Sequence, residues 1–546
     1  MHPFARLAAL TLFLLLPGCS ALGPASTLFS KGGEIELREQ MRPVRGTTRV
    51  LVLAFDGVSD AVLRTALADG SMPHLGAFLG ARTGENLYAN AYAVPGVVAI
   101  MPSETAAGWS AVFTGRAPGE NGIAGNEWFD RDSLRSWAPV PISTGTYKET
   151  IRIYSGDLLG GLIAVPTLFE RAGVRAHVAM GFVARGADLR NPPDLNDFDD
   201  LFEVVTEKLT GVDPLGAFKE LDEDTWEGVK GSTGRHGLPD LQIAYFPGVD
   251  LATHGEGPRV QREYLRTQTD KHVGRILDLY RRHGVLSNTY VVVVADHGHT
   301  ETRADDRHSL DVGDDEPTAL FDTLGYRLRA PGIGVDSSDY QAVVAYNEAT
   351  AAVYLADRST CPDEGDRCDW TRGPRLDADV LPLARAFYRA SVEGAYVPAL
   401  QGTLDLVLAR TSRDARGESP PFQVFDGQRL VPVPEYLAAN PRPDLVALER
   451  RLGWLTSGTF GHRAGDLLLM AKNGAERPID DRYYFGPAHA SGHGSAARSD
   501  GIIPLMVARA GASGATLRDV VTGAVGEAPT QLDITNLILS LLGVAR

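Results

Sequence analysis

Short uninterrupted runs of apolar residues recur along the chain, and each is long enough for one β-strand. Such runs, apolar on both faces, are typical of parallel sheets that are covered by helices on both sides. Longer segments between the runs favour helices, among them residues 260–282 and 532–542. This alternation predicts an open α/β sheet with helices on both faces. The apolar runs are residues 49–55, 241–246, 290–295, 466–470 and 503–507.

The interval from residue 308 to about residue 464 fits this alternation less well. It contains many aspartates, arginines and prolines, together with two of the three cysteines. We interpret residues 309–464 as an inserted cap region within a catalytic domain that extends over residues 47–546. One large α/β domain with an insertion is compatible with a chain of 546 residues.

The first residues have the pattern of an export signal. An apolar stretch from Leu7 to Leu16 follows a positive start and is too short to span a bilayer comfortably. The next residues complete a segment, Leu-Pro-Gly-Cys19, with the form of a bacterial lipobox. We therefore predict a lipoprotein-type signal peptide over residues 1–18 and a tether over residues 19–46. The exported protein would be anchored to a membrane at Cys19, facing the periplasm or the cell surface, and plain secretion is the alternative.

The other two cysteines, Cys361 and Cys368, flank a short polar turn. In an exported chain, two cysteines this close together favour a disulfide. Closing so short a loop contributes about 2.5 kcal/mol by the chain-entropy estimate. A metal site is the rival interpretation, but no third soft ligand lies nearby in the sequence.

The chain is acidic overall, with a formal net charge of −16. General binding to nucleic acids needs a basic face, so we expect no nucleic-acid-binding surface. An enzyme that processes phosphate groups is compatible with this charge, because bound metal ions can supply local positive charge.

Carboxylates and histidines follow three of the apolar runs. Ligands of open α/β sheets bind beyond the carboxyl ends of the strands, so these side chains are candidates for one common site. A carboxylate after a buried strand is costly unless it is paired or coordinated, and imidazole with carboxylate suits zinc or manganese. Taken singly, each has an ordinary alternative, such as a turn, a helix N-cap or a loop histidine. The candidates are Asp56, Asp250 with His254, Asp296 with His297, and later His493 in a glycine-rich loop.

The order of these residues along the chain resembles that of the metal-site residues in the alkaline phosphatase superfamily, and in particular in its type I phosphodiesterase/nucleotide pyrophosphatase branch. The resemblance covers most of residues 49–545. It implies an alkaline-phosphatase-like three-layer αβα sandwich with a mostly parallel central sheet. The motifs that carry it are Phe55-Asp-Gly-Val58, Met72-Pro-His-Leu75, Met101-Pro-Ser-Glu-Thr105, Phe113-Thr-Gly-Arg-Ala-Pro118, Gly122-Ile-Ala-Gly-Asn126, Asp250 with His254, Ala295-Asp-His-Gly298 and Gly492-His-Gly494.

The resemblance also implies a site that holds two divalent metal ions, Zn²⁺ or alternatively Mn²⁺. Two such ions can stabilise the attacking and the leaving oxygens of a displacement at phosphorus. The implied ligands are Asp250, His254 and His493 for one ion, and Asp56, Asp296, His297 and the Thr105 hydroxyl for the other.

By the same resemblance, Thr105 is the nucleophile, and metal coordination would lower the pKa of its hydroxyl. A covalent phosphothreonine would form and then be hydrolysed. Ser103 is a neighbouring competitor, but the spacing after Pro102 favours Thr105. Asn126 falls where this branch has an asparagine that hydrogen-bonds a phosphoryl oxygen, and a simple turn residue is the alternative.

Three further histidines lie near these motifs in the sequence. We expect His489 to line the site or to orient a metal ligand. His299 and His308 are left outside the metal set.

The predicted function is therefore the metal-dependent hydrolysis of a small-molecule phosphate ester, by a phosphodiesterase or nucleotide pyrophosphatase. A phosphomonoesterase with the same site is an alternative, and so is a non-catalytic surface-binding lipoprotein. A sulfatase is disfavoured, because the nucleophile position has no Cys/Ser-x-Pro-x-Arg segment. The residues around Trp109 and Asn121 differ from those of many phosphodiesterase relatives, which weakens the case for a nucleotide substrate.

Overall fold

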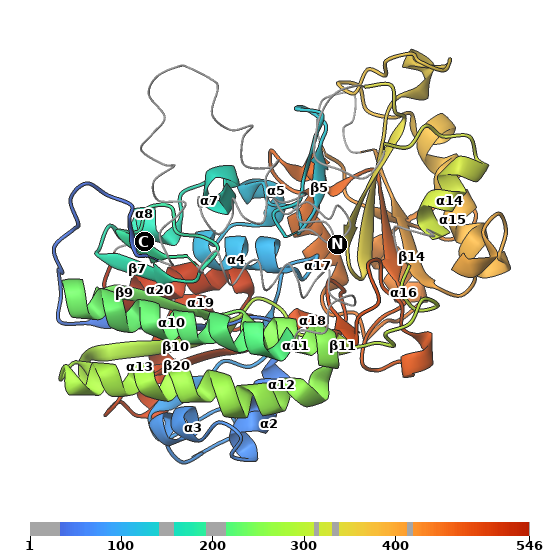
Figure 1. Cartoon of the computed structure of the whole chain (residues 1–546). Coiled ribbons are helices and arrows are strands. Elements are labelled where there is room, and N and C mark those ends of the chain that lie inside the picture. The colour runs from blue at the N-terminus through green and yellow to red at the C-terminus, as the bar shows by residue number, and fades with distance from the viewer. Residues whose placement is uncertain are drawn as a thin grey trace, which may run out of the picture.

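The computed structural model of the chain describes residues 33–140, 158–192, 214–310, 316–329, 338–411 and 419–544. The predicted signal peptide, Cys19 and the first part of the predicted tether lie outside the described residues. Figure 1 shows a central sheet among its helices and, beside it, a second sheet with helices of its own. Within the described residues, no helix has the length and apolar character needed to cross a membrane.

Among the described residues, the central sheet has eight strands and is mostly parallel. Its strands are β1 (Ile35–Glu36), β2 (Arg49–Phe55), β3 (Ala91–Ala93), β7 (Ala176–Ala179), β8 (Leu189–Asn191), β9 (Leu241–Phe246), β10 (Thr289–Ala295) and β20 (Leu505–Ala508). They lie in the order β1-β8-β7-β9-β2-β10-β20-β3. Three predicted strands form its middle, where β9, β2 and β10 pair in parallel, whereas β20 runs antiparallel to β10. The predicted mostly parallel central sheet is confirmed.

Helices cover both faces of the central sheet, which confirms the predicted three layers. Alternate residues of β2 point to opposite faces of the sheet. Leu51 and Leu53 pack against one helical layer, and Val50 and Val52 pack against the other. The strand is therefore apolar at every buried position. The first layer contains α2 (Asp60–Ala68), α3 (Pro73–Leu79), α10 (Pro214–His236), α11 (Gly248–Glu256), α12 (Pro258–Tyr264) and α13 (Asp270–Arg282). The second contains α4 (Thr105–Thr114), α8 (Leu168–Ala172), α19 (Gly514–Val525) and α20 (Ile534–Leu541).

The two predicted helices are present, each with an irregular turn. Residues 260–282 run from α12 through a π-helical turn, Leu265–Thr269, into α13. Residues 532–542 correspond to α20, which follows a 3₁₀ turn at Gln531–Asp533. The remaining short elements around the central sheet are β4 (Val97–Val98), α5 (Pro118–Asn121), β5 (Trp128–Asp130), β6 (Arg135–Trp137), α7 (Leu158–Leu162), β11 (Thr300–Glu301), β18 (Ser491–Gly492), α18 (Arg498–Gly501) and β19 (Ile502–Ile503).

In the part of the chain that the structure describes, the second sheet has six strands, and all neighbouring strands in it are antiparallel. Its strands are β12 (Ala342–Asn347), β13 (Thr350–Leu355), β14 (Leu404–Ala409), β15 (Gln423–Phe425), β16 (Leu430–Pro432) and β17 (Leu467–Ala471). Helices α14 (Glu316–Thr323), α15 (Leu381–Glu393), α16 (Val433–Ala439) and α17 (Leu448–Thr456) accompany it. Figure 1 shows this sheet at the right, with α14 and α15 on its outer side.

One apolar run lies in a different sheet from the one predicted. The sequence pattern groups residues 466–470 with the strands of the central sheet, but β17 pairs with β13 and β14 in the second sheet. Leu468 and Met470 of β17 pack into one apolar cluster, and Leu467 and Leu469 pack into another. A middle strand of a covered antiparallel sheet is thus as apolar as a parallel strand, so the pattern does not separate the two.

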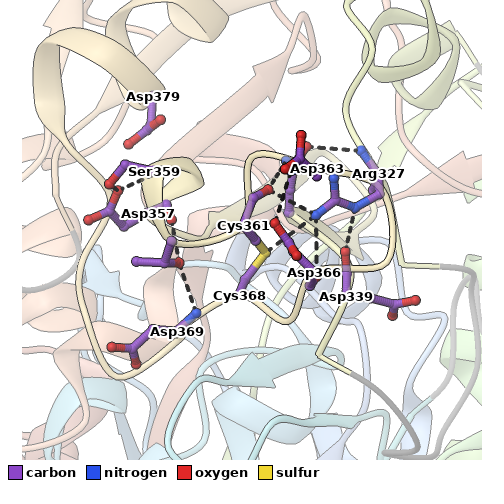
Figure 2. Close-up of a disulfide and its surroundings, with 12 residues drawn as sticks. Arg327, Asp339, Asp357, Ser359, Cys361, Asp363, Asp366, Cys368, Asp369 and Asp379 are labelled. Carbon is purple, nitrogen blue, oxygen red and sulfur yellow. Dashed lines mark hydrogen bonds between the residues drawn. A yellow bond between two sulfur atoms is a disulfide. The ribbon is translucent and has the colours of Figure 1, made fainter.

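The predicted disulfide between Cys361 and Cys368 is present in the loop after β13, with an S–S distance of 2.01 Å (Figure 2). Both cysteines are buried. Arg327 Nη2 donates to the carbonyl oxygen of Cys361 at 3.1 Å, and Gln341 Nε2 donates to the same oxygen at 3.0 Å. The two cysteines are a structural crosslink, and the rival metal interpretation does not hold.

Candidate metal centre

The carboxyl ends of the three middle strands lie side by side. Strands β2, β9 and β10 are in register up to their last residues. Asp56 directly follows β2, Asp296 directly follows β10, and Asp250 lies in the first turn of α11, just beyond β9. All three carboxylates are buried. Parallel register therefore brings together three acidic residues that are up to 240 positions apart in the sequence.

Asp56, Asp296 and His297 form the first group of potential metal ligands. His297 Nε2 lies 3.3 Å from Asp296 Oδ2 and 3.5 Å from Asp56 Oδ1. Thr105 Oγ1 lies 3.2 Å from the same nitrogen. The residues that the resemblance assigns to one ion, including the nucleophile, are thus gathered in one place.

Thr105 is the first residue of α4, whereas Ser103 points elsewhere. Ser103 Oγ donates to the carbonyl oxygen of Ser495 at 2.8 Å. Helix α4 passes directly against the first group, because a Cβ at Gly108 would lie only 2.8 Å from the Asp296 Cβ. Backbone N–H groups at a helix start favour an anion. The position therefore suits a hydroxyl that attacks a phosphoryl group, and the geometry favours Thr105 over Ser103.

Asp250, His254, His299 and His493 form the second group. His254 lies one helical turn after Asp250, and its Nε2 is 3.4 Å from Asp250 Oδ2 and 3.2 Å from His493 Nε2. His493 Nε2 is 4.0 Å from Asp250 Oδ1. The two groups adjoin, because the rings of His297 and His493 stack with centroids 3.8 Å apart. The three residues assigned to the second ion are therefore gathered as well.

His299, which the sequence analysis leaves outside the metal set, lies within this second group. Its Nε2 is 2.6 Å from Asp250 Oδ1, and its Nδ1 is 3.1 Å from Ser491 Oγ. The signal that points to it is its spacing from His297, because alternate residues of an extended segment share a face. His299 is therefore a further potential ligand, or a partner that holds Asp250.

The other two histidines lie farther out. His489 packs beside His254, with ring centroids 5.2 Å apart, and lies within reach of Glu348. Burial lowers the pKa of His489 to about 4. His308 instead bonds Asp305 through Nδ1 and stacks on Tyr483.

The carboxylates of the two groups have strongly shifted pKa values. Burial raises the pKa of Asp56 to about 8, and the charge of Asp250 adds to this effect. Burial and the negative charges of Asp56 and Asp250 raise the pKa of Asp296 well above its usual range. Burial also acts to raise the pKa of Asp250, but His254 and His299 outweigh it and hold this pKa well below its usual range. The histidines of the site therefore do not compensate the negative charge of all three buried carboxylates.

The histidines divide into two kinds. Burial lowers the pKa of His297 well below its usual range, and burial also lowers the pKa of His299 to about 4. Burial acts in the same direction on His254, but Asp250 and Glu348 raise its pKa to about 9. The lowered pKa values favour the neutral imidazoles of His297 and His299, and the neutral form is the one that binds metal ions.

Buried oxygen atoms test whether these residues fit metal ions. Across the part of the chain that the structure describes, no hydrogen-bond donor reaches Asp56 Oδ1 or Asp296 Oδ2. An uncompensated buried carboxylate is strongly unfavourable, and a cation would satisfy both oxygens. Each group supplies at least three potential ligand atoms within 4.8 Å of one another. The donor set of carboxylate and imidazole matches zinc or manganese, so the residues fit two such ions.

Asn126 lies directly beside the predicted nucleophile. Its Oδ1 accepts from the backbone N–H of Ala106 at 2.8 Å, and its Nδ2 donates to Glu104 Oε2 at 2.6 Å. The side chain is thus fixed at the first turn of α4. One N–H of the amide group stays available for a phosphoryl oxygen in addition to the bond to Glu104.

Three buried polar residues at the site are missed by the sequence analysis. Glu104 precedes the nucleophile, and burial raises its pKa to about 7. Asn347 and Glu348 come from the second sheet, where the turn between β12 and β13 contacts Asn126 and His493. Glu104 is detectable from its position beside Thr105. Asn347 lies 221 positions from Asn126 in the sequence, and Glu348 lies 145 positions from His493. No sequence motif marks either residue.

The fold and the site define a class of protein: an α/β enzyme with acidic and imidazole side chains gathered beyond the carboxyl ends of its parallel strands. The sequence profile of the type I phosphodiesterase/nucleotide pyrophosphatase family matches residues 50–377, more than half of the chain. The chain therefore belongs to the type I phosphodiesterase/nucleotide pyrophosphatase family. This membership confirms the predicted family and the predicted class of enzyme, a phosphoric ester hydrolase.

A comparison with solved structures finds matches of low sequence identity, including the following three. Murine ectonucleotide pyrophosphatase/phosphodiesterase 5 is 14% identical over 91% of this chain and 95% of that chain, with a TM-score of 0.49. The human protein of the same name is 12% identical over 91% and 95%, with a TM-score of 0.48. Phosphonoacetate hydrolase from Sinorhizobium meliloti is 15% identical over 93% and 100%, with a TM-score of 0.47. Among curated proteins, a sequence search finds no match.

Proposed function

We propose that the protein is a metal-dependent phosphodiesterase or nucleotide pyrophosphatase that acts through a phosphothreonine at Thr105. One observation carries the proposal. Thr105 Oγ1, at the start of α4, lies 3.2 Å from His297 Nε2, in a buried group of potential metal ligands. A hydroxyl in this position can be activated without a separate general base, because metal coordination lowers its pKa.

Two divalent ions, Zn²⁺ in preference to Mn²⁺, fit the donor atoms. When bound, such ions neutralise phosphoryl charge and lower the pKa of a hydroxyl or a water molecule. The residues that would hold them are Asp56, Asp296, His297 and Thr105 for one ion, and Asp250, His254 and His493 for the other.

The chain's own residues account for positioning in the proposed reaction. Thr105 Oγ1 forms a bond to phosphorus while the bond to the leaving oxygen breaks, and the alcohol or nucleotide departs with a proton. Water then attacks the phosphothreonine and restores the hydroxyl. Asn126 Nδ2 donates its second hydrogen to a phosphoryl oxygen, and the backbone N–H groups at the start of α4 favour the same negative charge.

The neighbouring charges favour a diester over a monoester. A monoester dianion needs additional positive groups, typically arginine or lysine. Apart from the proposed metal ligands, the buried side chains that contact Asn126 and His493 include two acids and an amide, Glu104, Glu348 and Asn347. Like charges repel a dianion more strongly than the single charge of a diester. The substrate we propose is therefore a small-molecule phosphodiester or pyrophosphate.

The test compares bis(4-nitrophenyl) phosphate with 4-nitrophenyl phosphate, for the wild type and a Thr105→Ala variant, with and without a chelator. We expect faster turnover of the diester, loss of turnover in the variant and in chelator, and recovery on adding zinc. A strong preference for the monoester would overturn the diester assignment. Absence of bound metal in the wild type would overturn the whole mechanism.

We further propose that the protein is exported and held to a membrane through a lipid on Cys19, facing the periplasm or the cell surface. The signal pattern over residues 1–18 supports this. A Cys19→Ser variant should move from the membrane fraction to the soluble fraction of the same compartment. Equal distribution of the two proteins would contradict the anchor.

A further inference from the structure

The tip of the β12–β13 hairpin, in the second sheet, is buried against the proposed site. β12 ends at Asn347 and β13 begins at Thr350, so Glu348 and Ala349 form the turn. Asn347 is 3% exposed and Glu348 is 5% exposed, although turns usually lie on the surface. Glu348 also has a φ of 47°, in the left-handed region that residues other than glycine seldom adopt. A buried, strained acidic turn points to a function.

Glu348 is placed between two of the proposed metal ligands. Its Oε2 accepts from the backbone N–H of His493 at 2.6 Å and lies 3.8 Å from His493 Nδ1. Its Oε1 lies 3.7 Å from His254 Nδ1. One carboxylate thus faces the Nδ1 side of both rings.

The Nδ1 side of each ring is also fixed by the backbone. His254 Nδ1 lies 3.0 Å from the carbonyl oxygen of Ser491, and His493 Nδ1 lies 3.1 Å from that of Ser103. Each Nδ1 therefore carries a hydrogen, and the two Nε2 atoms, 3.2 Å apart, are the atoms that would bind a metal ion once they have lost their protons. A carboxylate on the Nδ1 side makes such a ring a stronger metal ligand.

The other residue of the tip holds the phosphate side of the site. Asn347 Oδ1 accepts from the backbone N–H groups of Asn126 and Glu127, at 2.7 and 3.1 Å. Its Nδ2 donates to the carbonyl oxygen of Glu127 at 3.0 Å. The hairpin tip therefore bonds the segment that carries Asn126 as well as the segment that carries His493.

Glycines make room for this contact. A Cβ at Gly492 would lie 2.9 Å from Glu348 Oε2, and one at Gly494 would lie 2.4 Å from the carbonyl oxygen of Asn347. A Cβ at Gly125 would lie 2.2 Å from Asn347 Oδ1. The glycines on both sides of His493 and before Asn126 are thus explained by the close approach of the second sheet.

We propose that Glu348 is a positioning residue that sets the metal affinity of the His254–His493 pair, so that the second sheet is part of the metal centre. This inference rests on the proposed metal-dependent function. Glu348 bonds the backbone N–H of His493 and faces the Nδ1 side of both rings at 3.7 and 3.8 Å, so its negative charge strengthens both rings as ligands. Among the described residues, no hydrogen bond or ion pair joins Glu348 to Asp56, Asp296 or His297, so we expect the ion proposed for that group to be affected less.

The experiment measures zinc binding to the metal-stripped full chain by competition with a chromogenic chelator. Glu348→Gln keeps an oxygen for the His493 N–H but removes the negative charge. We expect one of the two zinc ions to bind about 10- to 100-fold more weakly, and the other to bind as in the wild type. Glu393→Gln, the same change at an exposed position on α15, is the matched control and should leave both affinities unchanged.

A second measurement separates positioning from a structural role. Excess zinc should restore kcat of Glu348→Gln towards the wild-type value, because the change lowers occupancy and not the chemistry. Equal zinc affinities in the variant and the wild type would overturn the inference, and so would a folding defect that zinc does not rescue. A wild type that binds no zinc would instead overturn the proposed function itself.

Discussion

The central sheet and the second sheet contribute to the site in different ways. The central sheet supplies proposed metal ligands directly after its strands, at Asp56 and Asp296, where parallel register fixes their relative positions. The second sheet contributes through a single turn, at Asn347 and Glu348, whose side chains bond residues of the first region. In the proposed mechanism, the first kind of residue carries the chemistry. The second kind would determine how firmly the chemical groups are held, so the second sheet would be more than a cover over the site.

The two regions also differ in how their contact depends on glycine. Strands of the central sheet meet their helices through ordinary apolar side chains. The second sheet reaches the site where Gly125, Gly492 and Gly494 leave room for backbone and polar side chains. A contact made of polar groups at close range tolerates little displacement. Changes at this junction should therefore affect metal and substrate binding together with stability.

The largest expected effect is on the central region, from Thr105→Ala. Removing the proposed nucleophile should lower kcat for bis(4-nitrophenyl) phosphate by at least about 10³-fold. Zinc content, measured by elemental analysis, should stay close to the wild type, because the other ligands are intact. Ser103→Ala is the control and should keep kcat within about tenfold, since its hydroxyl only bonds Ser495. Loss of turnover in the control with full turnover in Thr105→Ala would reverse the assignment.

The next effect concerns a proposed metal ligand of the same region. Asp296→Asn keeps an oxygen for the backbone N–H groups of Gly57 and His297, which Oδ1 accepts at 3.2 and 3.0 Å. It removes a charge from the first group, so activity at low zinc should fall by about 10²-fold. Excess zinc should restore part of it in a titration of rate against zinc. The exposed Asp519→Asn is the control, and a loss of activity that zinc leaves unchanged would speak against weakened affinity.

The junction between the two regions is tested with Gly494→Ala. A Cβ there would lie 2.3 Å from Glu104 Oε1 and 2.4 Å from the carbonyl oxygen of Asn347, at a φ of 84°. We expect the free energy of unfolding to fall by about 3 kcal/mol, from crowding and backbone strain together. Gly511→Ala has a similar φ of 80° and open space, so it should cost only about 1 kcal/mol.

Urea denaturation of both alanine variants measures the difference. Equal destabilisation at Gly494 and Gly511 would show that close approach of the second sheet contributes nothing beyond the backbone conformation.

The smallest expected effect is on the second sheet, from Asn347→Asp. The aspartate keeps an acceptor for the N–H groups of Asn126 and Glu127 but adds a negative charge beside the phosphate position. KM for the diester should rise about tenfold, since a nearby like charge disfavours the bound anion by about 1–2 kcal/mol. Zinc affinity should stay as in the wild type. Steady-state kinetics in saturating zinc measure the change, and an unchanged KM would separate Asn347 from substrate binding.

Much of the central region is predictable from the sequence because its signals are local. The apolar runs at residues 49–55 and 290–295 mark strands that are buried on both faces, and a carboxylate directly follows each. The spacing of Asp250 and His254 matches one helical turn. The run at residues 466–470 shows the limit of such signals, because β17 has the same composition in an antiparallel sheet.

The sequence by itself determined the central sheet, the residues that we propose for the chemistry and the cysteine pair, because each is marked by its nearest neighbours in the chain. Only the tertiary structure decided that His299 joins Asp250 and that Asn347 and Glu348 hold Asn126 and His493. These contacts depend on how two sheets pack and on the glycines that let them approach. Such packing is set by shape across more than a hundred residues of chain, and no local pattern records it.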